Sequence, residues 1–304
     1  MNARILSETA VLYFMQVVNC GSISEAATRM HVVPSAVSRQ IRRLENALET
    51  ALFERQARGV TLTPAGELLA AYARRTLLDA VQVTNEIQSL RQVSESKIKI
   101  ACTHGFASHF MPAGIAGFRE RRPDCTFQLQ VAPAREVTRR VREGEADIGF
   151  SFSLGATRDI KVLYSQPAPL LALVSPVHTL AQRPEVTLRD LAEFPLALPG
   201  INTTLRQLLD IYCSRQGLSY HSVLDSDNLD TLAQFAVTGS AVTFGGELFV
   251  RHHLSAGKLI ALNVPELKEN DRSIEIQALA SRHVSPVTEQ FIDYIREAIV
   301  PPLR

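Results

Sequence analysis

The chain has 304 residues, a formal net charge of +1 at pH 7 and a hydrophobic fraction of 46%. This composition excludes a chain that is disordered throughout, and the length suggests about two domains of roughly 150 residues each. The near-zero net charge gives no global sign of nucleic-acid binding, so any DNA-binding surface has to be local.

The sequence carries no sign of a membrane or secreted protein. No apolar run reaches the roughly 18 residues that a transmembrane helix needs. The first residues lead into an amphipathic pattern that includes Glu8, without a small-residue cleavage site, so we expect no signal peptide. The cysteines contain no CxxC pair, which argues against a disulfide framework or a zinc site; they are Cys20, Cys102, Cys125 and Cys213. We therefore expect a cytoplasmic protein with no membrane partner.

The first 33 residues predict two short helices. Gly21 ends the first helix, and Ser22 with Glu25 three residues later forms a capping box that starts the second. Four apolar residues of the first helix fall close to one face: Leu12, Phe14, Met15 and Val18.

A third helix is predicted from Pro34, whose missing N–H costs nothing at the first helical position. Its apolar residues are spaced four, three and four apart and form one buried stripe: Val37, Ile41, Leu44 and Leu48. The opposite face carries short hydroxyls and cations: Ser35, Ser38, Arg39, Arg42 and Arg43. This face suits a recognition helix, because short side chains let the backbone approach a major groove and arginines reach bases or phosphates. The plainer alternative is a solvated helix face.

Two short strands around residues 57–59 predict a hairpin wing after this helix. The wing would bring Arg55 and Arg58 near a phosphate backbone. Thr63 then caps the next helix, with Pro64 at its first position.

The motifs GSISEAA, PSAVSRQIRRLE, LFER and VTLTPAGE, in this order and spacing, resemble the winged helix-turn-helix of LysR-type transcriptional regulators. Val33-Pro34 stands where the family often has serine or threonine and then glutamine, which removes a side-chain cap and a common DNA-contacting amide. Glu49 stands where the family usually has glycine. The expected DNA-contacting residues are Ser22, Ser24, Pro34, Ser35, Ser38, Arg39, Arg42, Arg43, Arg55 and Arg58.

A long helix is predicted from Pro64 to about Arg91. Its seam residues alternate four and three apart, the period of a two-stranded coiled coil: Leu69, Ala73, Thr76, Ala80, Val83, Ile87 and Leu90. We favour pairing between chains over packing on the same domain, because helix-turn-helix proteins commonly read two half-sites as a dimer. The resemblance implies the same, with four chains in the full assembly.

The remaining residues alternate strands and helices, which predicts α/β layers with parallel strands and suits two lobes with a cleft between them. The predicted strands are 97–102, 126–131, 146–151, 170–174, 241–244 and 274–280, and the predicted helices are 106–121, 135–143, 204–216, 230–238, 247–254 and 287–299.

Four loops follow strands or precede helices, where ligands bind in such sheets: 102–105, 151–153, 199–204 and 244–247. Together they suit a small anion such as a carboxylate, although any one loop taken alone is better explained as a helix cap. The resemblance implies an effector domain similar to periplasmic-binding proteins, with the effector between its lobes. The expected effector-binding residues are Thr103, His104, Ser151, Asn202, Thr203, Thr204, Gly245 and Gly246.

Catalytic and metal-binding motifs are absent from the sequence: there is no GxSxG, GxGxxG, GK[ST] or HExxH. His252 and His253 are adjacent, so on a helix they point about 100° apart and chelate poorly as a pair. We therefore expect no enzyme, no cofactor and no metal.

The predicted architecture is multi-domain. It has an N-terminal all-α winged helix-turn-helix (1–63), a linker helix for dimerisation (64–92) and an α/β two-lobed, periplasmic-binding-like effector domain (93–304). Lobe I is expected at about 97–163 and 269–304, and lobe II at about 164–268.

The predicted function is a ligand-responsive transcription factor that binds double-stranded operator DNA as a homodimer or homotetramer and responds to a small-molecule effector, with RNA polymerase as a partner if it activates. We expect it in the cytoplasm, at the nucleoid. The alternatives for the C-terminal part are a solute-binding protein or a cofactor enzyme fused to a DNA-binding domain.

Overall fold

The computed structural model describes residues 9–56, 59–89, 96–155, 157, 159–239, 241–268, 272–280 and 282–299. The chain divides into two compact units, residues 1–93 and 94–304. Each unit has hydrophobic cores of its own. No helix in the described part of the chain is long and apolar enough to cross a membrane.

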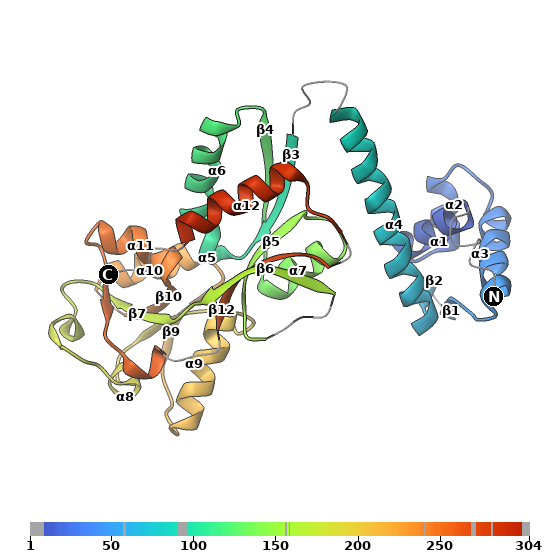
Figure 1. Ribbon diagram of the computed structural model, residues 1–304. Helices are drawn as coiled ribbons and strands as arrows, with labels where there is room; N and C mark the ends of the chain where they lie inside the picture. Colours follow the sequence, from blue (N-terminus) through green and yellow to red (C-terminus); the bar gives the residue numbers. More distant parts are fainter. Residues whose placement is uncertain are drawn as a thin grey trace. The chain divides into compact units, whose positions relative to one another are not determined.

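Three helices form the core of the first unit: α1 (Thr9–Cys20), α2 (Ile23–Arg29) and α3 (Pro34–Leu48) (Figure 1). The paired alanines of α2 are fully buried and let α1 and α3 approach closely; the largest side chains of this core are Phe14, Met15, Ile41, Leu44 and Leu52. The expectation that Leu12 shares the buried face was wrong: its side chain is 47% exposed, and Val11 is buried instead.

A two-stranded antiparallel hairpin, β1 (Phe53–Gln56) and β2 (Gly59–Leu62), follows α3 as predicted. The hairpin is fastened to the turn after α1, because the Val60 amide donates to the carbonyl of Gly21 at 2.9 Å. Gly59 has φ +106°, and a Cβ atom there would lie 2.4 Å from the same carbonyl oxygen. Only glycine fits this position.

The long helix α4 (Pro64–Ser89) starts after Thr63, whose hydroxyl accepts from the Gly66 amide at 3.0 Å. The first part of the predicted seam does not face outward. Leu69 and Ala73 are buried in the core of their own unit, so the alternative of packing on the same domain holds for them. Three later seam residues are exposed, namely Thr76, Ala80 and Val83. The side chain of Ile87 and all of Leu90 lie outside the described residues.

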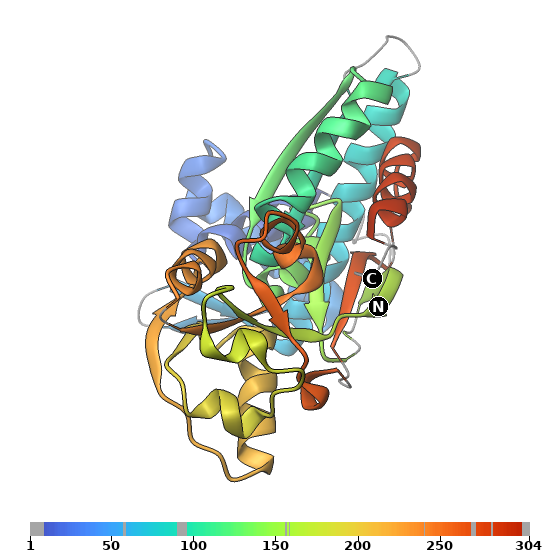
Figure 2. The same ribbon diagram turned by 90° about the vertical axis from the view of Figure 1, so that its left-hand side faces the viewer.

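Lobe I of the second unit is built on a five-stranded sheet of order β4-β3-β5-β12-β6. Helices α6 and α12 pack together against one face of this sheet, and α7 covers the other (Figures 1 and 2). The strands are β3 (Ser96–Cys102), β4 (Cys125–Val131), β5 (Ile148–Ser153), β6 (Ile160–Pro167) and β12 (Ser273–Leu279), and the helices are α5 (His104–Ala107), α6 (Phe110–Arg121), α7 (Ala134–Arg142) and α12 (Pro286–Ile299).

Lobe II is built on a second five-stranded sheet, of order β11-β7-β10-β8-β9. Its strands are β7 (Leu170–Val174), β8 (Leu196–Pro199), β9 (Ser222–Ser226), β10 (Val242–Gly246) and β11 (Ile260–Leu262). Its helices are α8 (Leu188–Ala192), α9 (Thr204–Arg215), α10 (Leu229–Val237) and α11 (Glu247–Ser255), with short 3-10 turns at Thr179–Gln182 and Pro265–Leu267.

The sheets are mixed, where the sequence alternation predicts parallel strands. In lobe I, β12 runs antiparallel to β5 and β6, and in lobe II, β7 runs antiparallel to β10 and β11. The reason is that β7 and β12 are the strands that begin directly after the chain crosses between lobes. Each enters its new sheet at the edge where β10 or β5 ends, so it runs the opposite way.

The predicted helix over 106–121 is also interrupted. The chain forms α5, turns at Ser108 and His109, and starts again as α6. His109 has φ −126° and ψ −47°, outside the helical region. This break places Ser108 and His109 next to lobe II.

Candidate functional site

The outer face of α3 is open to solvent, as a DNA-reading helix requires. Arg39, Arg42 and Arg43 are exposed, opposite the buried Val37 and Ile41. Pro34 and Ser35 are exposed at the start of the helix, and Ser38 is half-buried. The face therefore presents cations and a short hydroxyl on one rigid element, where they can approach a groove together.

The two ends of α3 reflect the two departures from the family pattern. Val33 occupies the N-cap position and makes no side-chain capping bond. Glu49 occupies the C-cap with φ 56° and ψ 31°, a left-handed conformation that favours glycine. The turn leaving the helix therefore keeps the glycine-type geometry although the residue is glutamate.

The serines of the second helix lie at its start. The Ser22 hydroxyl accepts from the Glu25 amide at 3.4 Å, which is half of the predicted capping box, and Glu25 pairs with Arg29 at 2.7 Å. Ser24 is exposed. In the wing, Arg58 and the side chain of Arg55 lie outside the described residues, so their predicted phosphate contacts stay predictions.

Two segments carry the chain between the lobes, one after β6 and one before β12. They are hydrogen-bonded to each other, because the Ala168 amide donates to the Arg272 carbonyl at 2.9 Å. Arg272 also donates from Nη1 to the Ala168 carbonyl at 3.0 Å. Arg272 is thus fixed at the crossing point of the two lobes.

The guanidinium of Arg272 is a charge held inside the protein: the residue is 3% exposed. Its Nε donates to the Thr204 hydroxyl at 3.3 Å, and the guanidinium stacks on the Phe152 ring at 3.7 Å from the ring centroid. Burial lowers the pKa of Arg272 to about 9, so the group is still a cation at pH 7. Thr204 and Gly246 both approach it, since a Cβ atom on Gly246 would lie 3.3 Å from Nη1.

Two predicted effector residues, Thr204 and Gly246, lie beside this arginine. Thr204 opens α9, and Gly246 occupies the N-cap of α11, so the positive ends of two helix dipoles lie beside the guanidinium. Gly105 lies against Phe152, where a Cβ atom would come within 2.7 Å of the ring. Gly245 is buried against Val250.

Thr103 stands at the N-cap of α5, 9% exposed, and its hydroxyl oxygen has no hydrogen-bond partner among the described residues. A buried hydroxyl without a partner costs free energy, so a ligand that supplies one is favoured here. His104, half-buried, follows as the first residue of α5.

Three other predicted effector residues are placed differently. The hydroxyl of Thr203 caps α9, accepting from the Arg206 amide at 3.2 Å and donating to the Gly200 carbonyl at 2.9 Å. Asn202 is exposed. Ser151 is buried on β5 next to Phe152, and because side chains alternate along a strand the two lie on opposite faces of the sheet.

The sequence reasoning missed Arg272 and the role of Phe152. Arg272 precedes a predicted apolar strand and belongs to no helical or strand periodicity, so no local signal marks it. Its contacts with Ala168 and Phe152 span more than 100 positions, and only the folded chain brings these residues together.

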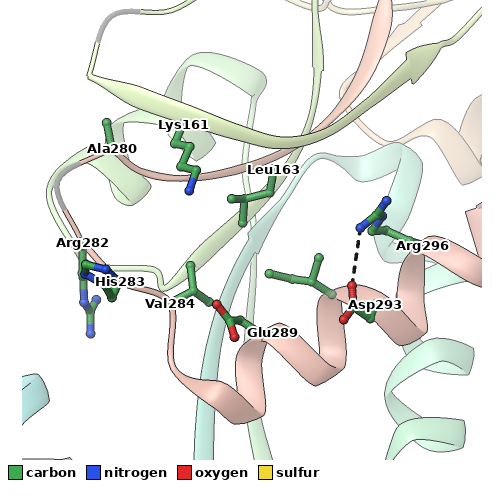
Figure 3. A pocket seen from close by; sticks show the side chains of 10 residues that line it. Lys161, Leu163, Ala280, Arg282, His283, Val284, Glu289, Asp293 and Arg296 are labelled. Atoms are coloured by element: carbon green, nitrogen blue, oxygen red, sulfur yellow. Dashed lines mark hydrogen bonds and ion pairs between the residues drawn. The ribbon is translucent and has the colours of Figure 1, made fainter.

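A shallow depression of about 360 Å³ lies elsewhere, between β6, the end of β12 and α12 (Figure 3). None of the predicted effector residues lines it. Its charges are mixed, with Asp293 paired to Arg296 at 3.5 Å on its wall. The other lining residues are Lys161, Leu163, Ala280, Arg282, His283, Val284, Glu289 and Ile292.

Three of the cysteines are core side chains. Burial raises the pKa of Cys102 to about 12 and also raises the pKa of Cys125 and Cys213. Because the thiolate is the nucleophilic form, these thiols are poor nucleophiles near neutral pH.

Comparison with known proteins gives matches over both units. A family model described as the LysR substrate binding domain matches residues 91–299, and one described as the bacterial regulatory helix-turn-helix protein, lysR family, matches residues 9–67. The HTH-type transcriptional regulator YjiE of Escherichia coli (strain K12) is 30% identical over 302 residues, which cover 95% of this chain and 94% of that protein.

Solved structures share the fold at lower identity. ArgP from Mycobacterium tuberculosis superposes with a TM-score of 0.70 at 20% identity, with 98% of each chain covered. Full-length CbnR in complex with its target DNA gives a TM-score of 0.58 at 18% identity, and the match covers 98% of this chain and 100% of that one.

Proposed function

The chain belongs to the LysR family of DNA-binding transcriptional regulators with an effector-binding domain, and from that premise we propose that its effector is a small carboxylate bound beside Arg272. The observation that carries the proposal is the buried guanidinium at the crossing point of the lobes. It contacts Phe152 of lobe I and Thr204 of lobe II.

The electrostatics of this position favour an anion. The positive ends of α9 and α11 lie next to a cation in a poorly solvated environment, where Coulomb interactions are stronger than in water. Arginine presents a planar fork of donors that matches a carboxylate. Gly246 supports the same site, because a Cβ atom there would lie 3.3 Å from Nη1. We assign Thr103 to it as well, because its buried hydroxyl lacks a partner among the described residues.

The same position explains how a ligand acts on the protein. An anion beside Arg272 contacts residues of both lobes, so it binds one relative arrangement of the lobes more tightly than another. Only such a difference in affinity shifts a conformational equilibrium. The shift then changes the spacing of paired α3 helices on the operator.

DNA reading is assigned to the exposed face of α3 and to the wing. We assign contacts in the groove to Ser35, Ser38, Arg39 and Arg42 and a phosphate contact to Arg43. The phosphate contacts of Arg55 and Arg58 in the wing stay predictions from the sequence. Pairing of two chains uses the outer part of α4, where Thr76, Ala80 and Val83 are exposed.

A dimer or tetramer built in this way acts in the cytoplasm at the nucleoid, and it contacts RNA polymerase where it activates. The function includes no catalytic step.

The test is a thermal-shift screen of the purified full-length chain with small carboxylic acids and amino acids, each paired with its carboxamide. An acid at roughly 100 times its Kd stabilises by about 2.7 kcal/mol, whereas its amide lacks the charge and gives a smaller shift. Acids and amides that raise Tm equally would contradict the anion site. An active acid is then added to a gel-shift assay with double-stranded operator DNA, where it changes affinity or the pattern of complexes.

A further inference from the structure

Three histidines and one aspartate gather where lobe I meets lobe II, near the C-terminal end of α11. His109 belongs to lobe I, at the break between α5 and α6. Asp230 belongs to α10, and His252 and His253 belong to α11, all in lobe II. His253 lies seven residues beyond Gly246, roughly 10 Å further along the helix axis.

His253 is buried, and its imidazole makes no hydrogen bond within the described part of the chain. The residue is 3% exposed, and neither Nδ1 nor Nε2 has a hydrogen-bond partner among the described residues. Its Nε2 lies 4.0 Å from Oδ1 of Asp230. A buried imidazole normally has a partner for at least one nitrogen, and no described residue supplies one here.

The neighbours of His253 are themselves held in place. The Ser108 hydroxyl donates to Oδ2 of Asp230, which leaves Oδ1 directed at His253. The ring of His109 stacks on that of His252, with centroids 4.3 Å apart and planes 26° apart. In metal sites of proteins, contacts of this kind hold a ligating carboxylate or imidazole in the orientation that coordination needs.

We propose that His109, Asp230 and His253 bind a divalent transition-metal ion that bridges the two lobes. One ligand atom from each of the three lies within 4.8 Å of the others. In a tetrahedral zinc site such atoms are roughly 3.3 Å apart. Side-chain rotations that move each ligand atom by about 1 Å would therefore bring the three to coordination distance. Two imidazoles and one carboxylate are the ligands of zinc, nickel and copper rather than of magnesium or calcium.

The ligands come from both lobes, and this gives the ion a role of its own. The chain already joins the lobes here through the Ser108–Asp230 hydrogen bond. An ion bound to His109, to the Asp230 carboxylate and to His253 would hold the two lobes together at this contact. The ion therefore stabilises one arrangement of the lobes independently of any anion beside Arg272.

The experiment titrates Zn²⁺ into the full-length chain after removal of metal with a chelator, and measures stoichiometry, Kd and Tm. One Zn²⁺ binds per chain, and Tm rises by roughly 5 °C at about 100 times Kd. Mg²⁺ at the same concentration leaves Tm unchanged. Co²⁺ in place of Zn²⁺ gives visible absorption bands that report nitrogen ligation.

The variants Asp230→Asn and His109→Gln each weaken Zn²⁺ binding about tenfold or more and abolish the Co²⁺ bands. Both positions are only partly buried, so we expect these two variants to fold, whereas a substitution of the buried His253 would also disturb packing. His221→Gln, which removes an exposed histidine elsewhere on lobe II, leaves Kd unchanged. Zn²⁺ binding of equal Kd in all three variants, or no uptake by the intact chain, overturns the proposal.

Discussion

The guanidinium of Arg272 lies 3.7 Å from the centroid of the Phe152 ring. The ring belongs to β5 of lobe I, and the arginine belongs to the segment that returns from lobe II. A cation–π contact of this kind is worth about 2 kcal/mol when it is desolvated. The pair therefore holds a positive charge at the junction of the lobes, which is where we propose that the effector binds.

Replacing Arg272 by glutamine is expected to abolish the rise in Tm that carboxylic acids produce. Arg272→Lys keeps the charge but loses the planar fork, so we expect binding to weaken about tenfold rather than to vanish. Isothermal titration with an active acid measures both. The control is Arg183→Gln, since Arg183 pairs with Asp190 on the surface. Unchanged affinity in Arg272→Gln would place the effector elsewhere.

Arg39→Ala and Arg42→Ala are each expected to weaken operator binding. An arginine that contacts a phosphate contributes about 0.9 to the slope of log K against log salt, so its loss makes the slope shallower. An arginine that reads a base costs about 1–3 kcal/mol and relaxes specificity instead. Fluorescence anisotropy at several salt concentrations separates the two. Arg215→Ala, on an exposed part of α9, is the control, and wild-type affinity in both α3 variants would remove that helix from the interface.

Glu49→Gly is expected to stabilise the first unit by about 0.5–1 kcal/mol. Glu49 has φ 56°, which costs a non-glycine residue roughly 1 kcal/mol, and part of the gain is offset by the greater freedom of glycine in the unfolded chain. Calorimetry of the full chain reports the transition of this unit. Glu49→Ala keeps the Cβ atom, so it gives no comparable gain; equal stabilisation by both would assign the effect to the lost charge.

His178 makes stability depend on pH. Its Nδ1 accepts from the Leu180 amide at 3.2 Å, and burial lowers its pKa in the folded state. As pH falls below about 6.5, the unfolded chain takes up a proton that the folded chain resists, so stability decreases. One such group contributes at most about 1.4 kcal/mol per pH unit.

His178→Asn keeps an acceptor at the same cap but does not titrate. Denaturant unfolding between pH 7 and pH 5 should therefore show a shallower loss of stability in His178→Asn than in the wild type. Parallel curves for the two proteins would show that His178 titrates alike in both states.

Much of the first unit follows from local sequence signals. Pro34 and the four-three spacing of Val37, Ile41 and Leu44 predict α3 and its buried side, and the structure confirms both. Gly21 and Gly59 mark the turns where the backbone has positive φ. These features are predictable because capping, turn geometry and helical periodicity depend on residues only a few positions apart.

The sequence alone also determined most helices and strands of the second unit and the family to which the chain belongs. It did not determine the direction of β7 and β12, the burial of Leu69 and Ala73, or the meeting of Arg272 with Phe152. His109 and His253 likewise come together only across the two lobes. Each of these depends on how distant segments pack. Packing is decided by the burial of whole surfaces, and no short pattern in the chain records it.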